Sequence, residues 1–135
     1  MNRLQATKAY QQINISSEAQ GASPHRLIGM LLEGTLKRLA EAKGAIERKD
    51  NAAKGETIGK AISIIGELQG SLRDIETNEV AANLDRLYDY MTSTLVQANL
   101  ESSSEKLNEV ALLIIDIKAG WDAIGTTQTG TAEPA

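Results

Sequence analysis

The feature that most limits the fold of this chain is the recurrence of apolar residues at helical spacing. It is clearest between Asn83 and Asn99, NLDRLYDYMTSTLVQAN. At about 100° per residue, one stripe of a helix is formed by Leu84, Leu87, Tyr88, Met91, Leu95 and Ala98. Tyr90 lies about 200° from Tyr88, so its ring points away from this stripe. The stretch is therefore expected to be a helix with one core face and one outward ring.

Three further segments carry the same spacing, and polar breaks separate them. Ser23-Pro24 is a favoured helix start, because Ser accepts from the first turn and Pro at N1 loses no hydrogen bond. Asp50 is the expected N-cap of the second helix, and Thr77-Asn78 precedes the third, expected over 79–99. Ser102 to Glu105, SSSE, matches a capping box that would open the fourth. Nothing alternates with period two, so we expect an all-α, antiparallel, up-and-down four-helix bundle.

Glycines interrupt the first two expected helices, and each costs roughly 1 kcal/mol relative to alanine in a helix interior. Their number in otherwise strong helices suggests close backbone approach, either of a neighbouring helix or of a ligand segment. They are Gly29, Gly34, Gly44, Gly55, Gly59, Gly66 and Gly70.

The two ends of the chain differ from the bundle, which we assign to residues 22–124. Residues 1–21 are polar and irregular, with Tyr10, Ile13 and Ile15 as their large apolar groups. They are read either as a tail that packs loosely on the domain or as a mobile docking segment. Residues 125–135, GTTQTGTAEPA, lack large apolar side chains and are expected to be a disordered tail.

The composition excludes several classes of protein. The net charge is −4 and no basic run is present, which argues against nucleic-acid binding. The chain has no cysteine, so it has no disulfide framework. No apolar run approaches the roughly 18 residues of a membrane span, and MNRLQATKAY lacks the apolar core of a secretory signal. A cytoplasmic protein is expected.

Catalytic and metal-binding patterns are missing. His25 is the one histidine, and the residue three before it is Ala22, so the Glu-x-x-His pairs of a bundle di-metal site cannot form. His25 is expected at the surface or helix start. No nucleophile elbow or phosphate-binding loop occurs, and Asp85 and Asp89 are expected on a solvated face. We expect no enzyme, no catalytic residues, no metal and no cofactor or small-molecule substrate.

What remains is an interaction surface. Leu112, Leu113 and Ile115 broaden the apolar arc of the fourth helix, and Met30 does the same on the first. One reading is a wide core face. The other is a groove between helices that accepts an amphipathic helix from a partner.

Six stretches together resemble a known family. They are KAYQQ (8–12), ASPHRLIGMLLEG (22–34), KAISIIGEL (60–68), NLDRLYDYM (83–91), LVQANL (95–100) and IDIKAGW (115–121). With this set the chain resembles FliS, the flagellin-specific export chaperones of bacterial flagellar type III secretion. The resemblance implies a cytosolic bundle that binds the disordered C-terminal segment of flagellin, prevents premature polymerisation and delivers it to the export gate. A non-enzymatic helical adaptor or regulator that binds a folded partner is the alternative.

The resemblance also implies roles for residues of this sequence. Export-gate docking or self-capping would fall to Tyr10, Gln11 and Ile13, although Thr7 stands where an aliphatic residue is expected in that segment. Tyr90 is a candidate wall of the client groove or docking site for the tail, and the alternative is a surface tyrosine that caps a neighbouring helix. Leu113 and Ile117 are candidates for their apolarity. The full client-binding set is Leu27, Leu31, Leu84, Leu87, Tyr88, Tyr90, Met91, Leu113 and Ile117.

Overall fold

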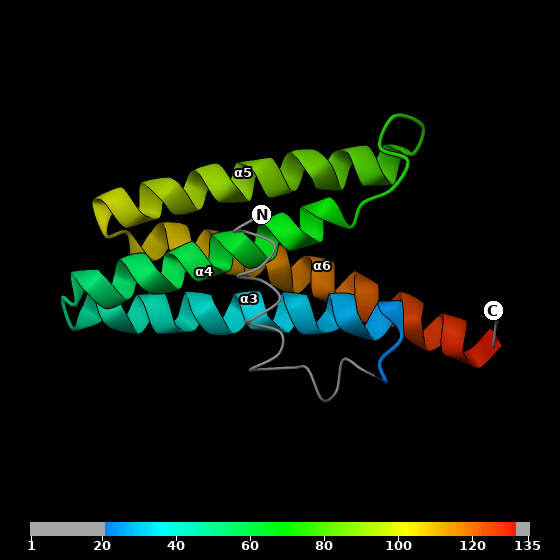
Figure 1. Ribbon diagram of the computed structural model, residues 1–135, viewed down its shortest axis with the longest axis horizontal. Coiled ribbons are helices and arrows are strands. Elements are labelled where there is room, and N and C mark those ends of the chain that lie inside the picture. Colours follow the sequence, from blue (N-terminus) through cyan, green and yellow to red (C-terminus); the bar gives the residue numbers. More distant parts are fainter. Residues whose placement is uncertain (1–20, 132–135) are drawn as a thin grey trace.

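The structure is a computed structural model that describes residues 21–131, with side chains through residue 124. In this part of the chain it contains four helices: α3 (Pro24–Glu47), α4 (Asn51–Gly70), α5 (Glu79–Glu101) and α6 (Ser104–Thr131). Each helix packs on the next in sequence, and α6 returns to pack on α3, which closes the ring (Figure 1). The predicted all-α, four-helix bundle is confirmed.

Local capping explains where three of the helices begin. The Ser23 hydroxyl accepts a hydrogen bond from the Arg26 amide at 3.1 Å, with Pro24 following at N1. Asp50 accepts from the Ala53 amide at 3.0 Å, and Asn78 caps α5 in the same way. These side chains satisfy amides that have no partner inside the helix. The starts predicted at Ser23, Asp50 and Asn78 are confirmed.

The predicted capping box of the fourth helix is wrong by one residue. Ser103, not Ser102, caps α6, and its hydroxyl accepts from the Lys106 amide at 3.1 Å. Ser102 instead ends α5 in the left-handed conformation, with φ of 51°. Its hydroxyl accepts a hydrogen bond from the buried Lys54 ammonium at 2.8 Å. Ser102 thus ties α4 to the α5–α6 connection, and Ser103 caps α6.

The helical backbone of α6 continues to Thr131, seven residues past the expected domain boundary at residue 124. In Figure 1 this end of α6 projects past the start of α3.

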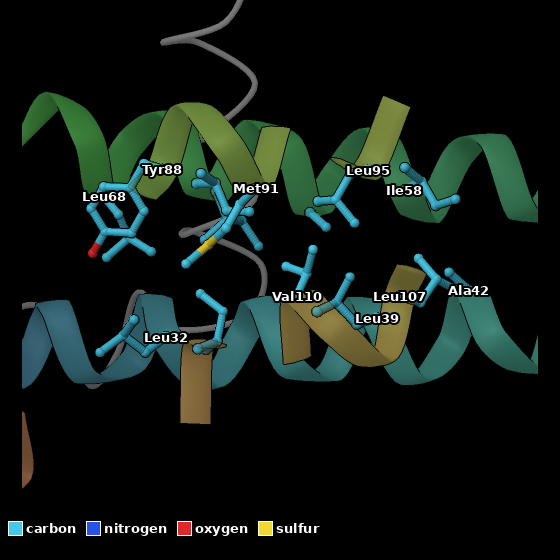
Figure 2. Close-up of a cluster of buried hydrophobic side chains, with 14 of the residues drawn as sticks. Leu32, Leu39, Ala42, Ile58, Leu68, Tyr88, Met91, Leu95, Leu107 and Val110 are labelled. Atoms are coloured by element: carbon cyan, nitrogen blue, oxygen red, sulfur yellow. The ribbon is translucent and has the colours of Figure 1, made fainter. Parts of the chain in front are cut away.

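The core fills the space between the four helices (Figure 2). Apolar side chains of all four meet there, and the Thr35 hydroxyl, also buried, donates to the Leu31 carbonyl at 2.9 Å. The largest of the fully buried apolar side chains are Leu32, Ile58, Ile65, Leu68, Met91, Leu95, Leu107, Val110 and Ile114. The stripe predicted on α5 faces this core, with Leu84 and Leu87 at its half-buried edge.

Close approach of a neighbouring helix does not explain five of the helix glycines. An added Cβ would meet nothing within 4 Å at Gly29, Gly55, Gly59 or Gly70, and at Gly44 it would meet only the flexible end of Arg48. At these positions no neighbouring helix approaches the glycine closely, so the neighbouring-helix interpretation is wrong there. The approach of a ligand segment to these glycines stays a prediction.

Candidate binding pocket

A pocket of about 730 Å³ opens at the end of the bundle where α3 begins and α4 ends. All four helices contribute to it, and its walls are mostly aliphatic and aromatic. Pockets of roughly 300–1,000 Å³ bury most of the surface of a ligand. The pocket is therefore large enough for more than one apolar side chain of a bound segment.

The first two turns of α3 form one wall. Leu27, Ile28 and Leu31 follow the helical spacing that places residues on one side of a helix, and Pro24 starts the helix at the rim. Leu27 and Ile28 are half-buried, whereas Leu31 is buried. This wall thus keeps apolar surface that the bundle itself does not cover.

The end of α4 and the residues after it form the opposite wall and carry the charges of the pocket. Leu68 and Leu72 supply apolar surface, while Glu67 and Arg73 add one acidic and one basic group. The Arg73 guanidinium donates to the carbonyl oxygens of Gly70 and Leu72 at 3.3 and 3.1 Å. The rim therefore has no net charge of either sign, and the apolar walls dominate what the pocket could bind.

The remaining walls come from α5 and α6. Leu84 and Tyr88 face the pocket from α5, and Ile117 and Trp121 face it from α6. Only 3% of Tyr88 is exposed, and its ring lies beside Leu68 (Figure 2). Burial raises the pKa of the Tyr88 hydroxyl to about 12, because the phenolate would lose hydration there. Tyr88 thus stays neutral in the pocket wall at physiological pH.

His25 and Trp121 meet at this pocket, although they are far apart in the sequence. Their rings are stacked with centroids 4.7 Å apart. His25 Nε2 lies 2.7 Å from the Trp121 carbonyl oxygen, and Trp121 Nε1 donates to the His25 carbonyl oxygen at 2.9 Å. His25 is at the helix start, as expected, but it is half-buried and paired. Sequence reasoning missed the pair because no local pattern links the two positions.

The structure brings together part of the client-binding set expected from the family resemblance. Leu27, Leu31, Leu84, Tyr88 and Ile117 line this one pocket. Leu87 and Leu113 are half-buried at the edge of the core and do not line it. Met91 is fully buried between the helices.

Tyr90 points outward, as its angular position in the helix predicts, and 47% of it is exposed. Its hydroxyl donates a hydrogen bond to the Glu109 carboxylate, which joins α5 to α6. This bond to Glu109 is the main reason that the pKa of Tyr90 is raised. Tyr90 therefore lies on the outer side of the α5–α6 seam, away from the pocket.

The two acidic residues expected on a solvated face also join helices. The side-chain amide of Gln69 on α4 donates to a carboxylate oxygen of Asp85 and to one of Asp89, each at 2.9 Å. Asp85 is half-buried and Asp89 is exposed. This contact ties α4 to α5.

Other expectations concern metal sites, membranes and the N-terminal segment. Among the described residues, no three His, Cys, Asp or Glu side chains are grouped to hold a metal ion. No helix in that part of the chain is long and apolar enough to cross a membrane. Tyr10, Gln11 and Ile13 lie outside the described residues.

Comparison with known proteins gives one consistent result. Residues 6–128 match the family model described as flagellar protein FliS. The flagellar secretion chaperone FliSB of Pseudomonas aeruginosa is 48% identical over 92% of this chain and 98% of its own length. The flagellar secretion chaperone FliS of Salmonella typhimurium is 42% identical over 87% of each chain. The flagellar secretion chaperone FliS of Vibrio cholerae is 37% identical over 87% of this chain and 86% of its own length.

Proposed function

The chain belongs to the flagellar protein FliS family, and from this premise we propose that it is a flagellar export chaperone for flagellin. The relatives named above carry the name flagellar secretion chaperone, which denotes binding and escort, not catalysis. In this proposal the chain binds the disordered C-terminal segment of flagellin in the cytoplasm. By covering that segment it prevents premature polymerisation of flagellin, and it delivers flagellin to the export gate.

The observation that carries the proposal is the apolar pocket at the end of the bundle. Leu27, Leu84 and Ile117 are half-buried in the free chain, so a bound segment would remove further apolar surface from water. Full burial of one large apolar side chain contributes about 1.5–3 kcal/mol. A few such side chains, placed by a segment that folds on binding, would offset the cost of ordering it.

The remaining candidates define a second contact region in the proposal. Leu87 and Tyr90 lie on α5, and Leu113 lies on α6, so a long segment could leave the pocket and continue along this seam. Met91 is fully buried beneath this face and would not itself contact the segment. Tyr10, with Gln11 and Ile13, would serve in gate docking or self-capping.

Isothermal titration of the chain with a flagellin C-terminal peptide tests the proposal. We expect Leu27→Asp to weaken binding at least about tenfold, because a carboxylate would be placed against the apolar wall. Leu112→Asp is the matched control, since Leu112 is on α6, is 64% exposed and does not line the pocket. Absence of binding by the wild-type chain would refute the flagellin proposal, and equal affinity of the two variants would refute the pocket as the site.

The adaptor alternative makes a different prediction for the same titration. An adaptor for a folded partner would bind that partner with unchanged affinity in the presence of excess peptide. Competition by the flagellin peptide therefore separates the two functions.

A further inference from the structure

The stacked pair of His25 and Trp121 joins the second residue of α3 to the turn of α6 that contains Trp121. Two hydrogen bonds run in opposite directions between them, at 2.7 and 2.9 Å, and the planes of the two rings differ by only 7°. A carbonyl oxygen can only accept, so His25 Nε2 carries the proton in this contact. Each ring thus donates to the backbone of the other residue, which fixes both position and rotation.

The pair stands where α6 leaves the bundle. Trp121 is half-buried, whereas residues 122–124 are exposed, and the helix backbone continues to Thr131 beyond the start of α3 (Figure 1). Ile117, one turn earlier on the same helix, is the other α6 residue that lines the pocket. A shift of this turn away from α3 would therefore move the whole α6 wall.

Two other polar contacts between α3 and α6 are less suited to holding this turn in place. Lys43 Nζ lies 3.4 Å from Asn108 Oδ1 in an exposed contact toward the other end of the bundle. Lys118 Nζ lies 3.6 Å from a Glu33 carboxylate oxygen, and both side chains are partly exposed. Exposed ion pairs contribute little because water screens them. The reciprocal pair is the better-defined link at the pocket.

We propose that His25 and Trp121 are positioning residues that hold the α6 wall of the pocket in the arrangement that receives a bound segment. The effect on client binding rests on the proposed chaperone function. The positioning itself is a property of the free chain. Holding the wall in place before binding spares the bound segment the cost of ordering it, which is the general advantage of preorganisation.

Two variants separate the hydrogen bonds from the ring contact. His25→Phe keeps an aromatic ring for stacking but cannot donate to the Trp121 carbonyl. His25→Gln removes the ring but retains a side-chain N–H donor at a similar reach. Trp121→Phe removes the opposite donor and serves if His25→Phe does not fold, as judged by circular dichroism. Lys43→Met is the control, because it removes an α3–α6 contact away from the pocket.

The first measurement uses the free chain. We expect His25→Phe and Trp121→Phe to increase the rate of amide hydrogen exchange at residues 117–124 by about tenfold. The reason is that each substitution removes one partly buried hydrogen bond. His25→Gln should restore part of the protection, and Lys43→Met should leave it unchanged. Trp121 is the one tryptophan in the chain, so acrylamide quenching of its emission should rise in His25→Phe alongside exchange.

The second measurement is the affinity for the flagellin C-terminal peptide. His25→Phe should bind about tenfold more weakly, with partial rescue by His25→Gln. Local exchange and affinity that match wild type, with only the thermal midpoint lowered, would overturn the proposal and leave a purely structural helix-start contact. If the wild-type chain binds no peptide, the chaperone proposal fails, while the exchange arm still decides whether the pair positions α6.

Discussion

Met91 and Leu27 provide a direct test of which apolar residues form the core and which meet a client. Both belong to the client-binding set expected from the family resemblance. Met91 is 0% exposed, within the cluster that joins all four helices (Figure 2). Leu27 is half-buried and lines the pocket. Truncation of each to alanine should therefore affect different quantities.

For Met91→Ala we expect a loss of about 2–5 kcal/mol in the free energy of unfolding, because the residue is fully enclosed and leaves a cavity. Domains of this size are commonly stable by about 5–15 kcal/mol. If about 5 kcal/mol remains, the unfolded fraction is on the order of 0.02%. Peptide affinity should then be unchanged, since binding is reduced only by the fraction of chain that is not competent.

For Leu27→Ala we expect a small loss of stability and a larger loss of peptide affinity. The side chain is only half-buried in the free chain, so its truncation should lower stability by about 1 kcal/mol. A client that covers it would lose about 1–2 kcal/mol of apolar contact, which is a five- to thirtyfold weaker affinity.

Urea unfolding and peptide titration on both variants separate these effects. The reasoning would be refuted if Met91→Ala weakened binding as much as Leu27→Ala while its urea midpoint stayed at the wild-type value.

Three further predictions use other features of the chain. Burial raises the pKa of Tyr88 from 10.0 to about 12, so between these values the unfolded chain loses a proton that the folded chain keeps. The wild type should thus lose about 2–3 kcal/mol of stability relative to Tyr88→Phe as pH rises through this window; parallel urea midpoints of the two proteins from pH 9 to 12 would contradict this. Gly59→Ala should stabilise the chain by about 0.5–1 kcal/mol, because Gly59 is exposed in α4 and an added Cβ meets nothing within 4 Å; a lower thermal midpoint would argue against it. Tyr10→Ala should leave flagellin binding mostly intact and impair its delivery, and equal loss of both in pull-downs with flagellin and with the export gate would reject that division.

The helix starts show how much of the fold is local. The side chains of Ser23, Asp50 and Asn78 each accept a hydrogen bond from the backbone amide three residues later, so their roles follow from neighbours in the sequence. The start of α6 departs from its pattern by one residue, because Ser102 is the left-handed C-cap of α5. Lys54 of another helix also donates to the Ser102 hydroxyl, which no reading of SSSE could include.

The pocket shows the same limit for function. Helical spacing placed Leu84, Tyr88 and Met91 on one stripe, yet it could not say that the first two reach a pocket while the third is enclosed. It also placed Tyr90 outward without indicating its bond to Glu109. Exposure along a stripe depends on how far each turn lies from its neighbours across the bundle.

The sequence by itself determined the number of helices within the described residues, three of their starts, the faces they bury and, through six matching stretches, the family. These properties depend on hydrogen bonds and spacing within a few residues, or on residue identity alone. Only the tertiary structure decided which apolar side chains remain uncovered and that His25 meets Trp121 across the bundle. Those outcomes depend on packing between segments far apart in the chain, where contacts are set by the approach of whole helices and not by local pattern.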